Sequence, residues 1–231
     1  MELVEEGNMA TPQHRSREEW LEVLRGMTEG HLFGQPEKTY DSAAAVVKYY
    51  FEIGLLHDCD FIVDIGSGNG RLAIPLAERD VRYLGLEPKQ ACVDFCCRAF
   101  EPWPHIQIKY LDLWNPHYNP SGKIDPNKVS FPVADNSVDA VILHSVFTHL
   151  GRLETCERYL LETRRMLKPG GKCLCSWFRS PPHKLSDAAA RTVFRESDII
   201  ELIKPFKAIY TRGGYSGPND QWDTLLEKPA G

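Results

Sequence analysis

Short apolar runs alternate with helical runs along most of this chain, and this alternation limits the fold more than any other feature. The expected strands cover residues 61–65, 82–87, 106–113, 138–144, 171–178, 206–212 and 221–228. Between most of them lie helical runs, at residues 70–80, 88–100, 152–168 and 195–204. Strands that alternate with helices predict a mainly parallel sheet with helices on both faces.

The last two expected strands are joined differently from the others. Only residues 213–220 separate them, and this connection is too short for a crossover helix. We therefore expect an antiparallel hairpin at the C-terminus, at the end of an α/β sheet of seven mostly parallel strands.

Two helices are expected before the first strand. Ser16 and Glu19 form a capping-box pattern, and Gly26 follows as a stop signal. A second helix over residues 41–56 is expected to open at Asp41 or Ser42. We expect a flexible tail over residues 1–15 and a single domain over residues 16–231. Within the domain, residues 16–57 form a small N-terminal helical cap, and residues 58–231 form a core with a Pro-, Gly- and Asn-rich loop insertion at 114–130.

Composition excludes several classes of function. Of the 231 residues, 42% are hydrophobic and 26% are charged, as in an ordinary globular protein. The net charge of -5 provides no basic field for nucleic acid. No apolar run reaches the ~18 residues of a membrane span, and the start lacks a signal-peptide pattern. We therefore expect a cytoplasmic protein with no nucleic-acid or membrane partner. The seven cysteines lack paired metal-ligand spacing, so no metal site is expected.

The segment "VDIGSGNGR", residues 63–71, carries most of the functional information. Gly66, Gly68 and Gly70 follow an expected strand, so the chain can turn sharply and a ligand can approach the backbone closely. A tight strand-to-helix turn needs glycine as well. Glu87 ends the next strand 21 residues after Gly66, where an acid can bind both ribose hydroxyls.

That spacing also suits NAD, so a dinucleotide site has to be distinguished from a site for another cofactor that contains ribose. A dinucleotide site has the pattern G-x-G-x-x-G beneath a pyrophosphate. Here the pattern is G-x-G-x-G, and Asp64 precedes its first glycine by two residues. A carboxylate at this position repels a pyrophosphate and suits an ammonium group.

Three motifs in order, "VDIGSGNGR", "LGLEP" and "MLKPGGKCLCSWF", resemble those of class I S-adenosylmethionine-dependent methyltransferases. The resemblance covers roughly residues 60–178, and the terminal hairpin agrees with that family's seven-stranded Rossmann-like sheet. It implies a methyltransferase with S-adenosylmethionine as cofactor. The candidate cofactor-binding residues are Asp64, Ile65, Gly66, Ser67, Gly68, Gly70, Glu87, Pro88, Asp112, Leu113 and His144.

The resemblance also implies a role for several of these residues. Asp64 faces the ammonium group of the methionine moiety, Glu87 holds the ribose hydroxyls, and Pro88 packs on the adenine. The family places an acid after the third strand to bind the adenine amino group, with the next backbone N–H on a ring nitrogen. Asp112 and Leu113 occupy these positions. Because the following insertion is long, Asp125 is a rival, and we favour Asp112 because it ends an apolar strand.

The end of the fourth strand is expected to lie beside the sulfonium. His144 and His149 are therefore the candidate catalytic residues, with a neutral imidazole as the base for an alcohol or phenol. The alternative for His149 is a packing role in a helix. A base is optional, because an amine needs only to be uncharged when it attacks.

The acceptor pocket is expected from elements outside the core. Its candidate substrate-binding residues are Tyr40, Trp114, Tyr118, His149 and Arg179. This lining suits a small-molecule substrate, and a hydroxyl is slightly favoured over an amine. The segment "NPHY", residues 115–118, is similar to an N-methyltransferase signature, but it follows the third strand instead of the fourth. We interpret it as part of a loop.

Two alternatives belong to other classes of function. A NAD-dependent oxidoreductase shares the first βαβ unit and Glu87, but it lacks the terminal hairpin. A catalytically silent protein of the same fold is the second, and the intact Asp64, Gly66, Gly68 and Glu87 argue against it. The sequence predicts neither the acceptor nor the oligomeric state.

Overall fold

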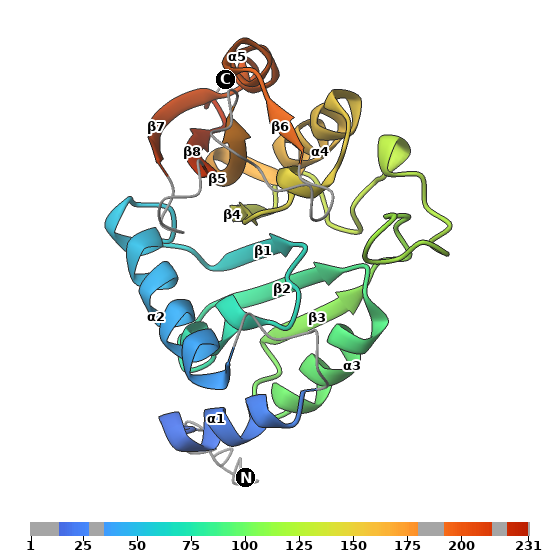
Figure 1. Cartoon of the computed structure of the whole chain (residues 1–231). Helices are drawn as coiled ribbons and strands as arrows, with labels where there is room; N and C mark the ends of the chain where they lie inside the picture. The colour runs from blue at the N-terminus through green and yellow to red at the C-terminus, as the bar shows by residue number, and fades with distance from the viewer. Residues whose placement is uncertain (1–13, 28–34, 180–191, 214–220, 231) are drawn as a thin grey trace, which may run out of the picture.

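A central sheet carries helices on both of its faces (Figure 1). The computed structural model describes residues 14–27, 35–179, 192–213 and 221–230. In this part of the chain the strands follow the order β3-β2-β1-β4-β5-β8-β7, and β6 pairs with β5 off this path. The pairs among β1 to β5 are parallel, whereas β8 is antiparallel to both β5 and β7. The mostly parallel sheet and its C-terminal hairpin are confirmed.

The sheet has one strand more than predicted. Its described strands are β1 (Phe61–Ile65), β2 (Arg82–Glu87), β3 (Ile106–Tyr110), β4 (Val138–Leu143), β5 (Leu167–Arg179), β6 (Val193–Phe194), β7 (Lys207–Gly213) and β8 (Gln221–Glu227). The additional strand, β6, has two residues and pairs with Phe178 and Arg179 of β5. A pairing this short leaves no period in the sequence, so the expected seven strands become eight.

The helices divide between two hydrophobic cores. They are α1 (Arg17–Arg25), α2 (Pro36–Glu52), α3 (Gln90–Ala99), α4 (Leu153–Met166) and α5 (Glu196–Ile203), with the short 3-10 helices η1 (Arg71–Leu76), η2 (Pro126–Lys128) and η3 (Phe147–His149). The first core packs α1, α2, α3 and η1 on one face of the sheet. The second core packs α4, α5 and η3 on the other face.

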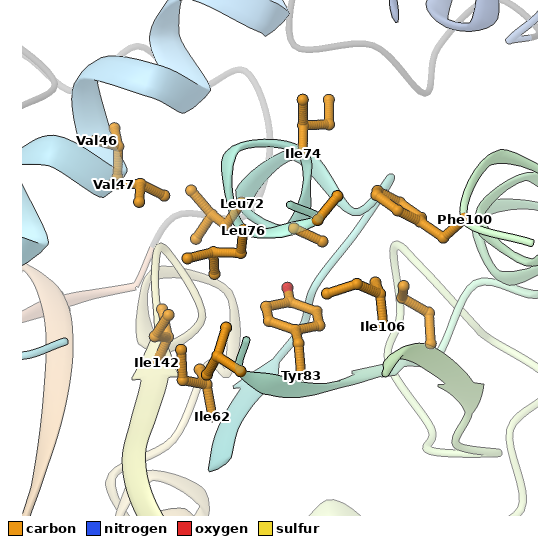
Figure 2. Close-up of a cluster of buried hydrophobic side chains, with 14 of the residues drawn as sticks. Val46, Val47, Ile62, Leu72, Ile74, Leu76, Tyr83, Phe100, Ile106 and Ile142 are labelled. Carbon is orange, nitrogen blue, oxygen red and sulfur yellow. The ribbon is translucent and has the colours of Figure 1, made fainter. Parts of the chain in front are cut away.

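Figure 2 shows the first core, which we call the α2-side core. Val46 and Val47 of α2 lie against Leu72 and Leu76 of η1, and Tyr83 of β2 points toward η1 from the sheet. All five side chains are buried. Because strand side chains alternate between faces, the second or α4-side core takes the intervening strand residues.

The beginning of α1 agrees with its sequence pattern. Ser16 accepts a hydrogen bond from the Glu19 backbone N–H, the Glu19 side chain binds the Ser16 backbone, and Gly26 is the C-cap. The second helix begins earlier than expected, because Pro36 occupies its first turn and Gln35 is its N-cap. The expected opening at Asp41 or Ser42 is therefore wrong.

Three further element boundaries differ from the prediction. Residues 70–80 form only the 3-10 helix η1, which contains Pro75 and so lacks one backbone donor. Strand β3 ends at Tyr110 instead of residue 113. Strand β5 begins at Leu167, where the sequence predicted helix, because Leu167 pairs with Val138 of β4.

The insertion at residues 114–130 has a defined conformation. Asn115 and Asn119 exchange backbone hydrogen bonds of 3.0 Å, and Ile124 bridges to Leu113. The Asn115 side-chain oxygen accepts from the backbone N–H groups of His117 and Tyr118, at 2.9 and 3.1 Å. Asn115 thus closes a turn, in agreement with the interpretation of "NPHY" as part of a loop.

Most of the expected N-terminal tail lies outside the described residues. Of residues 1–15, the structure describes only the last two. Arg15 donates to the Ala99 carbonyl at 2.9 Å, and its guanidinium lies 4.5 Å from the Trp20 ring centroid. The domain limits 16–231, with the cap at 16–57 and the core at 58–231, stay an expectation.

Candidate active site

The strand order identifies the edge of the sheet where a ligand is expected. Strands β2 and β3 extend the sheet on one side of β1, and β4 and β5 extend it on the other side. In open α/β sheets, ligands bind outside the carboxyl ends of the strands at such a switch point. The residues that follow β1 to β4 are therefore the candidate site.

The glycine loop after β1 has a left-handed backbone at three positions. The φ angles of Gly66, Gly68 and Gly70 are 72°, 56° and 70°. A Cβ on Gly70 would lie 2.7 Å from the Phe100 ring, so this glycine allows α3 to pack closely. A Cβ on Gly68 would meet no described atom within 4 Å. Gly68 therefore leaves space where a ligand can approach the backbone.

Ser67 presents a buried polar atom inside this loop. Its side chain is 7% exposed, and its hydroxyl has no hydrogen-bond partner among the described residues. Gly85 of β2 makes room for it, because a Cβ there would lie 2.5 Å from the Ser67 Oγ. Buried hydroxyls are normally paired, so this orphan hydroxyl fits a polar group of a bound cofactor.

Glu87 ends β2 and is held by two backbone donors. Its carboxylate accepts from Gly68 N–H at 2.8 Å and from Lys89 N–H at 2.9 Å. Burial raises the pKa of Glu87, and these hydrogen bonds oppose that rise. Each oxygen keeps acceptor capacity for a ribose hydroxyl. Pro88 is part of the same turn and is partly buried.

Asp64 is a buried carboxylate on β1, next to the buried Ile65. It is 2% exposed, and its Oδ2 accepts a hydrogen bond from the Tyr83 hydroxyl. Burial raises the pKa of Asp64 to about 7, whereas the Tyr83 bond and the Arg71 charge act in the opposite direction. An ammonium group beside this carboxylate would restore its ionised form.

A row of polar side chains lies on the same face as Asp64. Strand alternation places Asp64, His144, Ser176 and Asp223 on the face of the α2-side core. Ser176 donates to Asp223 Oδ1 at 2.8 Å, and both side chains are buried. The carboxyl ends of β1, β4 and β5 thus share one polar surface with the start of β8.

His144 follows β4 and contacts helix α2. Its Nδ1 lies 2.6 Å from the hydroxyl of Tyr50, a fully buried residue. The next residue, Ser145, has a φ of 59° and accepts from the Gln221 side chain at 2.9 Å. A left-handed non-glycine residue marks a backbone that its surroundings hold in place.

The residues after β3 are placed as follows. Asp112 Oδ1 accepts from the Tyr110 hydroxyl at 2.9 Å, and this bond lowers the Asp112 pKa, whereas burial acts in the opposite direction. The Leu113 backbone N–H binds the Leu111 carbonyl at 2.6 Å. Leu113 must release that bond if its N–H is to reach an adenine.

Asp125 has a local role. Its side chain accepts from the Asn127 backbone N–H at 2.9 Å and caps η2. It also forms an ion pair with Lys128 at 3.9 Å. Asp112 is left as the acid next to the end of β3.

A cavity of about 540 Å³ lies between the insertion and the segment after β4. Trp114 and His149 both line it, together with Asp125 and Arg152. Tyr118 lies edge-on to His149, with ring centroids 5.5 Å apart. The structure therefore brings together three of the five expected substrate residues.

The other expected substrate residues lie elsewhere. Tyr40 is ten residues before Tyr50 on α2, which is ~15 Å along the helix axis, and the Arg17 guanidinium lies over its ring. Tyr40 is thus far from His144. Arg179 ends β5, and its side chain lies outside the described part of the structure.

The two candidate catalytic histidines have separate surroundings. His144 contacts Tyr50 of the α2-side core. His149 ends η3, whose Phe147 packs in the α4-side core, and the His149 carbonyl accepts from Asn115 at 3.3 Å.

Tyr50, Tyr83 and Arg71 were not predicted as site residues. Each comes to lie near Asp64 or His144 only in the folded chain. In the sequence they look like ordinary helix and strand residues, so the pattern carried no usable signal.

The described ranges contain neither a cluster of metal ligands nor a membrane-spanning helix. Among these residues, no three His, Cys, Asp or Glu side chains are grouped to hold a metal ion. None of the helices that the structure describes has the length and apolar character needed to cross a membrane.

The sheet order, the glycine loop and the fixed Glu87 carboxylate together define a Rossmann-like site for a nucleoside cofactor. Residues 63–175 match the family model described as a methyltransferase domain. This match begins in β1 and ends in β5. The match covers just under half of the chain, and it supports a class I S-adenosylmethionine-dependent methyltransferase with S-adenosylmethionine as cofactor.

Solved structures share this fold at low sequence identity. A methyltransferase from Methanosarcina mazei is 17% identical, with a TM-score of 0.56 over 78% of this chain and 98% of that one. The N-methyltransferase NodS from Bradyrhizobium japonicum, solved with S-adenosyl-L-homocysteine, is 16% identical, with a TM-score of 0.59 over 91% and 98%. The cyclase SpnF is 15% identical, with a TM-score of 0.62 over 91% of both chains.

Proposed function

We propose that this methyltransferase acts on a small-molecule acceptor. The observation that carries the proposal is the cavity of about 540 Å³ between the insertion and the segment after β4. Small-molecule sites usually have volumes of roughly 300–1,000 Å³. The net charge of -5 adds support, because it offers no electrostatic attraction to nucleic acid.

Within the cofactor site, we assign roles to the chain's own groups. Asp64 binds an ammonium group, Glu87 binds the ribose hydroxyls, and the orphan Ser67 hydroxyl takes a polar atom of the ligand. Asp112, in preference to Asp125, binds the adenine amino group. When bound, S-adenosylmethionine supplies an electrophilic methyl group, so the protein has mainly to align the acceptor and exclude water.

Two acceptor chemistries follow from the sequence. A hydroxyl, which the sequence favours slightly, needs a base such as His144 or His149. An amine attacks through its own lone pair. NodS is an N-methyltransferase by its published name, and this supports nitrogen as one of the two candidates.

The proposal is tested with labelled methyl groups and a panel of phenols, sugars, amines and carboxylic acids, followed by mass analysis of the product. We expect transfer to at least one of these small acceptors. Methylation of RNA or protein, with none of the panel methylated, would contradict the proposal.

A cavity variant tests the acceptor contacts separately. Trp114→Ala should raise the acceptor KM roughly tenfold, or ~1.4 kcal/mol, while the Kd of S-adenosylhomocysteine stays the same. Leu161→Ala is the matched control, because Leu161 is an exposed apolar residue of α4 that does not line the cavity. Equal KM values in the two variants would remove Trp114 from the acceptor site.

A further inference from the structure

The contact between Tyr50 and His144 joins the N-terminal cap to the reacting end of the sheet. The two residues are 94 positions apart, and their side chains meet at 2.6 Å. Their rings are arranged edge to face, with centroids 6.2 Å apart. Tyr50 has no exposed surface, so water cannot satisfy its hydroxyl group.

The hydroxyl of Tyr50 keeps its hydrogen. Burial and the nearby carboxylates of Asp223 and Asp64 raise the pKa of Tyr50 well above its ordinary value. A buried hydroxyl hydrogen needs an acceptor. In the part of the chain that the structure describes, His144 Nδ1 is the partner found for this hydroxyl.

An imidazole nitrogen accepts a hydrogen bond only when it carries no hydrogen itself. If Tyr50 donates to Nδ1, the single hydrogen of a neutral His144 is on Nε2. Burial, assisted by the Arg71 charge, lowers the pKa of His144 to about 3, so the ring is neutral at physiological pH. Its Nε2 can then donate a hydrogen bond but cannot take up a proton.

We propose that Tyr50 is a positioning residue that holds His144 in the Nε2–H tautomer, and that the acceptor of this methyltransferase is a neutral amine. The proposal rests on the proposed small-molecule function and turns its preference from a hydroxyl to an amine. His144 presents a hydrogen-bond donor, which can orient an oxygen or nitrogen atom of the ligand. It does not act as a general base that removes a proton from the acceptor.

The charges along the polar row agree with an amine. The amine lone pair forms the new N–C bond while the C–S bond breaks, and the electron pair of that bond goes to sulfur. Positive charge therefore moves to nitrogen, and the ammonium product loses its extra proton to solvent. The buried carboxylate of Asp223 on this row favours positive charge and opposes an alkoxide.

The tautomer can be measured without cofactor or turnover. Long-range proton–nitrogen NMR of the full chain labelled at histidine nitrogen distinguishes protonated from unprotonated ring nitrogens, and His144→Gln identifies the His144 signals by their loss. We expect Nε2 protonated and Nδ1 unprotonated in the wild type. A wild-type ring with hydrogen on Nδ1 would overturn the proposal.

Two variants show whether Tyr50 causes this state. Tyr50→Phe removes only the hydroxyl group, so the Nδ1 signal should shift toward the position of a mixture of tautomers. Tyr49→Phe is the matched control, because Tyr49 is a buried neighbour on the same helix, and it should leave the His144 signals unchanged. Identical His144 signals in the wild type and Tyr50→Phe would show that Tyr50 does not set the tautomer.

The acceptor class has its own test. With amines of different basicity, the rising limb of the pH–rate profile should follow the acceptor's own pKa. Turnover of an alcohol, with a rising limb that His144→Ala or His149→Ala abolishes, would overturn the amine assignment but leave small-molecule methylation standing. Failure of the whole panel would instead count against the proposed function, and the NMR result would be unaffected.

Discussion

At the scale of single residues, the site depends on carboxylates whose surroundings differ. Asp64 is buried on β1, two residues before Gly66, and its pKa is raised to about 7. Glu87 is buried too, but two backbone N–H groups hold its oxygens in place. Asp112 lies near the surface and is bound by Tyr110. These differences predict separate effects for each acid.

Asp64 should release a proton when the cofactor binds. The pKa of Asp64 is about 7 in the folded protein, against an ordinary value of 3.8. Protonated Asp64 therefore contributes to the stability of the folded state, and this stabilisation is lost as the pH rises from about 4 through about 7. A ligand ammonium group favours the ionised form. At pH 6, calorimetry of S-adenosylhomocysteine in two buffers of different ionisation enthalpy should therefore show about one proton released.

Asp64→Asn should abolish this proton release, since the amide cannot titrate. Asp94→Asn is the control, because Asp94 is an exposed acid of α3 and should leave the release unchanged. Binding heats that are equal in both buffers for the wild type would contradict the role of Asp64.

Glu87→Ala should weaken S-adenosylhomocysteine binding by ~1–3 kcal/mol, because it removes the proposed ribose contacts and the acceptor for Gly68. Asp112→Ala should weaken binding less, and it should not weaken the binding of an analogue that lacks the adenine amino group. Titration calorimetry measures the Kd of each of these two variants and of a third, Asp125→Ala. If Asp125→Ala, and not Asp112→Ala, shows the adenine effect, the assignment of the third-strand acid is wrong.

At the scale of elements, the insertion at 114–130 is attached to the core by specific contacts. Gly122 packs against the backbone that leads out of β3, where a Cβ would lie 2.5 Å from the Leu113 carbonyl. The Thr155 hydroxyl of α4 donates to the Asn127 side chain at 2.6 Å. The loop therefore packs closely on both β3 and α4.

Gly122→Ala should lower the free energy of unfolding by ~1–3 kcal/mol, because the added methyl group forces the loop away from a backbone that cannot give way. Urea titration measures this change. The exposed neighbour Ser121 supplies the control, and Ser121→Ala should stay within about 0.5 kcal/mol of the wild type. An unchanged urea midpoint for Gly122→Ala would mean that the loop can move aside freely.

At the scale of the whole molecule, one sheet separates two cores and connects every part of the site. The glycine loop, Glu87 and the polar row come from different strands, and they meet only when the sheet is formed in its order. A ligand that binds only the folded chain should therefore stabilise all of it.

S-adenosylhomocysteine at 100 times its Kd should raise the free energy of unfolding by about 2.7 kcal/mol. Denaturant unfolding, with and without ligand, measures this shift, and NADH at the same concentration should produce none. Glu87→Ala at equal ligand concentration should show a smaller shift. Stabilisation by NADH alone would contradict the cofactor assignment.

Local patterns in the sequence determined the order of strands and helices, the C-terminal hairpin and the cofactor motifs. These features depend on side-chain period, turn chemistry and capping, which act over a few residues. The Ser16 cap and the glycines after β1 illustrate this, because their backbone conformations follow from the residues themselves.

Only the tertiary structure decided which polar side chains meet. Tyr50 reaches His144 across 94 residues, and Gln221 reaches Ser145 across 76. The same packing holds Tyr40 away from His144. Such contacts depend on burial and on the register of distant elements, and no local sequence period encodes either of them. A buried hydrogen bond stabilises the protein only after the surrounding core has excluded water.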